Sequence, residues 1–153
     1  MKKILTLVCA ALLAMGANAD TGKAKYAHLY KNLPFSMEQV TAPTFPDNKV
    51  NLKDFGAKGD GSSLCTEAFA KAIDALSQKG GGRLVVPQGV WYTGPIVLQS
   101  NIELHLQKGA IILFSPDPDL YKLIDTSFEG LNTRRCQSPI SGTNLVNVAI
   151  TGQ

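Results

Sequence analysis

The chain has 153 residues, of which 44% are hydrophobic and 18% are charged, and this balance excludes a disordered or collagen-like protein. The formal net charge is +3, from 15 basic and 12 acidic residues. Two of the basic residues, Lys2 and Lys3, lie in a segment that we expect to be removed, which leaves the mature chain nearly neutral. A nearly neutral chain is not typical of proteins that bind nucleic acid or an anionic membrane, so neither partner is expected.

Residues 1–19 have the pattern of a secretory signal peptide. A basic start is followed by an apolar stretch over residues 4–16 and by Ala17-Asn18-Ala19, which matches a cleavage site of the A-x-A type. The apolar stretch is short for a helix that spans a membrane. We expect cleavage between Ala19 and Asp20 and a periplasmic or secreted protein; an uncleaved membrane anchor is the alternative.

Cys65 and Cys136 are the cysteines that remain after this cleavage. An oxidising compartment permits a disulfide between them, and two separate buried thiols fit the sequence equally well. The chain has no cysteine or histidine spacing typical of a zinc site, and no loop that would bind a phosphate or a dinucleotide. We therefore expect no metal and no cofactor.

Residues 20–49 predict a mostly irregular leader, because prolines interrupt polar residues that have no sustained period. One short helical turn around Leu29 and Tyr30 is the exception that the sequence allows. The pattern changes at Val50, so a domain is predicted over residues 50–153, beginning with a short strand at residues 50–52.

A single helix is predicted after the glycine-rich turn that follows this strand. Ser62, Ser63 and Thr66 offer hydroxyl oxygens for its N-cap. Apolar residues then recur at helical spacing and form one stripe, which consists of Ala68, Phe69, Ala72, Ile73 and Leu76. Three glycines, residues 80–82, end the helix.

Beyond Gly82 the pattern predicts short strands separated by turns. They are expected at residues 83–86, 90–93, 96–98, 102–106, 110–114, around 140 and at 145–150, with a polar excursion, rich in proline and aspartate, from Ser115 to about Gln137. Similar segments at 100–106 and 143–149 indicate a solenoid in which Asn101 and Asn144 occupy equivalent corners and bond to backbone. The one-faced helix would cover its open end. A β-sandwich remains an alternative.

Several of these stretches resemble the pectate-lyase-like right-handed β-helix superfamily. Residues 54–61 look like its opening motif, and residues 80–96 and 100–115 like its first coils. Residues 134–152 are similar to the polygalacturonase-type glycoside hydrolases. The resemblance covers residues 50–153 and implies an all-β fold, the first coils of a right-handed parallel β-helix with an N-terminal capping α-helix.

The resemblance implies a secreted enzyme that hydrolyses pectic polysaccharide or oligogalacturonide with inversion, in the manner of a polygalacturonase or rhamnogalacturonase, and that is a monomer when complete. The catalytic motifs of this family are Asn-x-Asp, Asp-Asp, His-Gly and Arg-x-Lys, and none of them occurs in residues 1–153. No catalytic residue is therefore assigned, the substrate-binding residues are unknown, and the chain is expected to be an inactive N-terminal fragment. A calcium-dependent polysaccharide lyase and a non-catalytic carbohydrate-binding or tailspike-type β-helix are the alternatives.

Some polar residues have a structural and a functional interpretation. Asp54 and Asp60 flank glycine turns and are expected to cap backbone groups instead of forming a catalytic pair. Glu103 and His105 share the strand face opposite the apolar residues, so we expect a solvated surface, with a minor place in a sugar groove as the alternative.

Aromatic and basic residues are treated in the same way. Trp91 and Tyr92 are expected to pack in or near the core, although either ring could stack on a sugar. Arg134 and Arg135 are expected to be solvated, and contact with an acidic polysaccharide is the weaker hypothesis.

Overall fold

A computed structural model describes residues 26–153 of the chain. The chain divides into two compact units, with the boundary between Thr44 and Phe45. The predicted signal peptide lies outside the described residues. Among the residues that are described, no helix is long and apolar enough to cross a membrane.

The described part of the first unit contains one 3₁₀ turn, η1 (Ala27–Tyr30). The hydroxyl oxygen of Tyr30 accepts a hydrogen bond of 3.1 Å from the backbone N–H of Val40. Residues 31–44 form no helix or strand, as the prolines predict.

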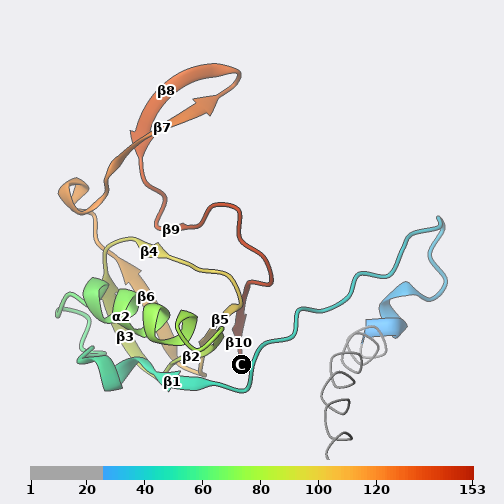
Figure 1. Ribbon diagram of the computed structural model, residues 1–153, viewed down its shortest axis with the longest axis horizontal. Coiled ribbons are helices and arrows are strands. Elements are labelled where there is room, and N and C mark those ends of the chain that lie inside the picture. The colour runs from blue at the N-terminus through green and yellow to red at the C-terminus, as the bar shows by residue number, and fades with distance from the viewer. Residues whose placement is uncertain (1–25) are drawn as a thin grey trace, which may run out of the picture. The chain divides into compact units, whose positions relative to one another are not determined.

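The second unit is built from three parallel sheets. The first sheet contains, in order, β1 (Lys49–Asn51), β2 (Gly82–Val86), β5 (Ile102–Leu106) and β10 (Ala149–Gly152). The second sheet pairs β3 (Gly89–Thr93) with β6 (Ala110–Phe114). The third sheet pairs β4 (Ile96–Val97) with β9 (Ile140–Ser141). Two turns of the chain, β2-β3-β4 and β5-β6-β9, each contribute one strand to each sheet in sequence order, and β1 and β10 extend the first sheet at its two edges, so the strands stack into coils (Figure 1). This arrangement confirms the predicted parallel β-helix and excludes the sandwich, whose sheets are antiparallel.

The interior of the coils is apolar because alternate strand residues point inward. Leu84 and Leu104 stand side by side in successive turns, and both are fully buried. Trp91 and Ile96 fill the interior from the other two sheets of the first turn. Burial of one large apolar side chain contributes about 1.5–3 kcal/mol, so the stack stabilises itself one turn at a time.

The helix α2 (Thr66–Ser77) packs against η2 (Leu52–Phe55) and against strands of the first turn (Figure 1). All five residues of the predicted apolar stripe are buried in the same core as the coil interior. The helix therefore covers the apolar interior where the chain enters the coils. The predicted end is also confirmed, because Gly80 adopts a left-handed φ of 85° and the N–H of Gly81 bonds to the carbonyl of Leu76 at 2.9 Å.

The predicted N-cap of this helix is wrong. Cys65 occupies the N-cap position and makes no capping bond with its side chain. The hydroxyls of Ser62 and Ser63 bond instead to Asp60, and Thr66 Oγ1 accepts a bond of 2.7 Å from the N–H of Gly94. These hydroxyls join the turn and the helix to neighbouring segments, which local helix-capping rules do not take into account.

The predicted first strand at residues 50–52 is found one residue earlier, at Lys49–Asn51. It ends at Asn51, whose side-chain oxygen accepts a bond of 3.0 Å from the N–H of Lys53 and so starts η2. The chain then rejoins the coil path at Asp60, which forms a parallel bridge with Val90 of β3.

Close backbone approaches require two of the glycines after α2. A Cβ atom at Gly81 would collide with Asn101, and one at Gly82 would collide with the carbonyl oxygen of Asn48. Both glycines also have positive φ, so a side chain would be strained as well as crowded.

The predicted repeat is offset from the one that the structure shows. Ala149 pairs with Glu103, which brings Asn147, not Asn144, beside Asn101. The residues before Ala149 form a corner in place of the predicted strand at 145–148, with Asn147 at a φ of 55°. The similar sequences of residues 100–106 and 143–149 therefore do not occupy equivalent positions in successive turns of the coil.

The polar excursion between β6 and β9 contains regular structure that the sequence pattern did not indicate. It contains a 3₁₀ turn, η3 (Pro118–Leu120), and an antiparallel hairpin of β7 (Leu123–Phe128) and β8 (Leu131–Cys136). The hairpin, orange in Figure 1, projects away from the stacked strands, and every residue of β7 is exposed. The sequence pattern did not reveal it because both of its faces meet water and no alternation results.

Candidate functional site

Polar side chains gather on the outer face of the first sheet, where residues of successive turns stand in register. Arg83 of β2 pairs with Glu103 of β5, and His105 of β5 pairs with Thr151 of β10. Glu103 and His105 point outward as the alternation predicts, but only 6% and 9% of them are exposed, so the predicted solvated surface is wrong. The side chains of the neighbouring turns contact and cover them.

These four side chains form one hydrogen-bonded chain, the outer-face network. Arg83 Nε donates to Glu103 Oε2 at 2.7 Å, and Thr151 Oγ1 donates to Glu103 Oε1 at 2.8 Å. Thr151 Oγ1 also lies 2.7 Å from His105 Nδ1. Since the hydroxyl has one proton and donates it to Glu103, His105 must donate from Nδ1 to Thr151.

The network favours the ionised form of its carboxyl group. Burial by itself would raise the pKa of Glu103, but the hydrogen bonds from Arg83 and Thr151, together with the positive charge of Arg83, lower the pKa below its usual value of 4.5. The site therefore holds a buried carboxylate whose two oxygens are both bonded.

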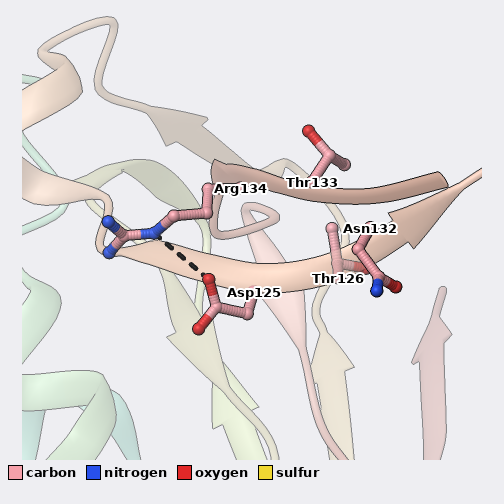
Figure 2. A pocket seen from close by; sticks show the side chains of 5 residues that line it. All are labelled: Asp125, Thr126, Asn132, Thr133 and Arg134. Carbon is pink, nitrogen blue, oxygen red and sulfur yellow. Dashed lines mark ion pairs between the residues drawn. The ribbon is translucent and has the colours of Figure 1, made fainter.

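A second polar site lies on the hairpin, shown in Figure 2. Asp125, Thr126, Asn132, Thr133 and Arg134 line an open pocket of about 550 Å³. Arg134 Nε lies 3.2 Å from Asp125 Oδ1, and both side chains are largely exposed. The guanidinium of Arg135 lies 4.8 Å from the centre of the Phe128 ring. Both arginines that were considered for contact with an acidic polysaccharide thus stand on an exposed hairpin, where contact with a ligand stays a prediction.

Asp60 has the capping role that was predicted for it. Its side chain accepts from the backbone N–H groups of Ser63, at 2.7 Å, and Ser62, at 2.9 Å, and from both serine hydroxyls. These bonds, led by the one from the Ser63 N–H, hold the pKa of Asp60 well below its usual range. Asp54 lies in the first turn of η2 and is exposed.

Trp91 and Tyr92 both have packing roles, as expected. Trp91 is fully buried and its Nε1 donates to the carbonyl of Pro87 at 2.7 Å. Tyr92 is half-buried, and its hydroxyl lies 2.7 Å from Oγ of Ser115, where the excursion begins. The burial of Trp91 leaves no face of its ring open for stacking on a sugar.

The two described cysteines are not paired. Cys65 is buried beside the start of α2 and Cys136 is exposed at the end of β8. Of the two alternatives, separate thiols are thus what the structure shows, although the expectation that both are buried is wrong for Cys136.

The parallel sheets, the capping helix and the outward polar network define a β-helix protein. No family model matches the chain. A Vitis vinifera protein named as a probable polygalacturonase is 32% identical over 158 residues, which cover 98% of this chain and 31% of the relative. An exo-poly-α-D-galacturonosidase of Dickeya chrysanthemi is 42% identical over 88 residues, or 55% of this chain and 14% of the relative.

A solved structure gives the same result. The exopolygalacturonase of Thermotoga maritima superposes with a TM-score of 0.69 at 43% sequence identity, over 88% of this chain and 28% of that one. The chain is therefore related to the polygalacturonase-type glycoside hydrolases of the right-handed β-helix superfamily, and the matched residues cover between 14% and 31% of the length of these three relatives. The predicted family and handedness are confirmed.

Proposed function

We propose that the second unit forms the first coils of an enzyme that hydrolyses the glycosidic bonds of pectic polysaccharide. The observation that carries this proposal is the joint match in sequence and coil geometry to polygalacturonases over nearly the whole chain. The relatives are named for cleavage of polygalacturonate, so a galacturonate polymer is the substrate class that we propose.

The role proposed for these coils is that of a scaffold. Inverting hydrolysis needs two carboxyl groups about 6.5–9.5 Å apart, one as a general acid and one to activate water. Asp60 and Glu103 do not suit these tasks, because hydrogen bonds already occupy the oxygens of both carboxylates. We propose that residues outside these 153 supply the catalytic pair and that the chain alone releases no sugar.

The test is a product analysis with polygalacturonate. A polypeptide that continues this chain to the length of its relatives should release reducing ends with inversion at the anomeric carbon, whereas the 153-residue chain should release none. Formation of an unsaturated product, seen by its ultraviolet absorbance, would identify a lyase instead. Hydrolysis by the short chain would overturn its scaffold role.

The location proposed for the protein is the periplasm or the extracellular space, where polymeric pectin is accessible. The predicted signal peptide supports this, with cleavage between Ala19 and Asp20. Mass spectrometry of exported material should show Asp20 as the first residue; retention of Met1 would contradict the proposal.

A further inference from the structure

The hairpin of β7 and β8 has two faces of different chemistry. Successive strand residues point to opposite sides, so Arg134 and Arg135 stand on different faces. Arg134 lies beside Asp125, whereas Arg135 lies beside Phe128. The Phe128 face consists of Ile124, Thr126, Phe128, Leu131, Thr133 and Arg135.

The charge of Arg135 is not neutralised within the part of the chain that the structure describes. Asp125 pairs with Arg134 on the opposite face, at 3.2 Å. Glu129, the other acid of the hairpin, lies in the turn between the strands, and neither it nor Arg135 forms an ion pair among residues 26–153. Arg135 contacts the Phe128 ring instead, and a ring attracts a cation without neutralising it. The Phe128 face is therefore positively charged.

Large apolar side chains on the same face are open to solvent. Phe128 is 52% exposed and Leu131 is 72% exposed, and neither belongs to the core that the coils and α2 share. An exposed aromatic ring beside an unneutralised cation suits a ligand that carries both an apolar surface and a negative charge.

The root of the hairpin is fixed to the coil at both of its ends. The hydroxyl of Tyr121 donates a bond of 2.8 Å to the carbonyl of Ser115, the residue after β6. Nε2 of Gln137 donates a bond of 3.1 Å to Oγ of Ser141 in β9. The Phe128 face thus belongs to an arm with a fixed base between the second and third sheets, which lowers the entropy that a ligand loses to it on binding.

We propose that the Phe128 face binds an acidic polysaccharide, with Arg135 at a carboxylate group and Phe128 against the apolar side of a sugar ring. This inference rests on the proposed function, because galacturonate units supply both the carboxylate and the ring. The guanidinium suits a carboxylate because its donors match the two oxygens. Arg134, which Asp125 already neutralises, has no such role.

The experiment measures the binding of an oligogalacturonate, and of its fully methyl-esterified form, to the 153-residue chain by isothermal titration calorimetry. The wild type should bind the free acid and bind the ester at least about tenfold more weakly, since the ester has no charge for Arg135. Arg135→Gln should weaken binding of the free acid about tenfold, which corresponds to about 1.4 kcal/mol, and leave binding of the ester unchanged. Arg134→Gln removes the same charge from the opposite face of the same strand and should bind as the wild type does.

Two further variants test the aromatic ring and the whole arm. Phe128→Ala should weaken binding of the acid and of the ester alike, by about threefold to tenfold, because it removes apolar contact and not charge. Replacing residues 123–136 with a short glycine-rich turn removes the whole Phe128 face and should weaken binding of the acid by at least about tenfold. Circular dichroism should show that all of these variants are folded, since the side chains that they change are exposed.

An equal Kd for the wild type and Arg135→Gln would overturn the inference, as would an equal loss of affinity in Arg134→Gln. Equal binding of acid and ester would overturn it as well. So would a wild-type chain that does not bind, while hydrolysis by the longer polypeptide would still support the proposed function.

Analytical ultracentrifugation tests a second copy of the chain as the alternative occupant of the Phe128 face. The wild type and the chain without residues 123–136 should have the same state of association. A mass that halves when the hairpin is replaced would show that a second copy covers the face, and this would contradict the proposal.

Discussion

Asn147 Nδ2 donates a hydrogen bond of 3.1 Å to Asn101 Oδ1, although the two residues are 46 positions apart in the chain. Both have left-handed backbones, with φ of 55° and 62°. Asparagine is one of the few residues with a side chain that adopt this conformation readily. The corner that leads into β5 is therefore repeated in the corner that leads into β10, and the two are bonded to each other.

Replacing this corner asparagine should destabilise the fold. Asn101→Ala loses the tolerance of a left-handed backbone, about 1 kcal/mol, and the side-chain hydrogen bond, about 1 kcal/mol, so the free energy of unfolding should fall by about 2 kcal/mol. Asn101→Gly keeps the backbone freedom and should lose about half as much. Urea denaturation measures both; equal losses for the two variants would show that backbone strain plays no part.

The contact between α2 and the coil interior should be a main source of stability. Phe69 is 1% exposed, and Phe69→Ala should lower the free energy of unfolding by about 3–5 kcal/mol because it leaves a cavity. Leu64, just before the helix, is 51% exposed, and Leu64→Ala should change the stability by less than about 0.5 kcal/mol. Thermal denaturation of the two variants compares them; a similar melting temperature for both would mean that the helix does not close the core.

Stability should fall in acid because of Glu103. Its pKa is lower in the folded chain than the usual 4.5, so its contribution is fully present above pH 4.5 and is lost as the pH falls through the folded value. Glu103→Gln should flatten the dependence of unfolding free energy on pH below 4.5, measured by urea denaturation at several pH values. Asp60, whose pKa is also lowered, should leave a residual slope in the same direction. A slope unchanged from the wild type would contradict the bonded carboxylate; the exposed Glu67→Gln is the control.

The hairpin should be dispensable for folding. All of β7 is exposed, and the backbone N–H of Gln137 bonds to the carbonyl of Lys122 at 2.8 Å, which closes the base of the hairpin. Replacing residues 123–136 with a short glycine-rich turn should therefore change the free energy of unfolding by less than about 1 kcal/mol, since little apolar area leaves the core. Circular dichroism and urea denaturation test this. Loss of the cooperative transition would show that the coils depend on the hairpin.

The coils could be predicted because their strands obey a local rule. From Arg83 to Phe114 the strands alternate inward and outward residues and are separated by turns that contain a glycine, a proline or an asparagine, so their limits were nearly right. The helix was equally clear, since its apolar stripe repeats at helical spacing. Both the strands and the helix could be predicted without knowing which other segments of the chain they pack against.

The outer-face network could not be predicted, because its members come from different turns. Arg83 precedes Glu103 by 20 residues, and Thr151 follows it by 48. Alternation showed that Glu103 points outward, but burial depends on what the adjacent turns place beside it. The prediction that Asn101 and Asn144 occupy equivalent positions failed for a related reason. The register of two strands is set by how they pair, and similar sequences do not reveal this pairing.

The third sheet resumes its pairing, Ile96 beside Ile140, as though the hairpin between β6 and β9 were not there. The coil therefore accommodates a long segment at this corner while the pairing of β4 with β9 is kept. We expect that this segment can be lengthened, shortened or exchanged, which would change the exposed surface at this corner while the stacked strands keep their positions.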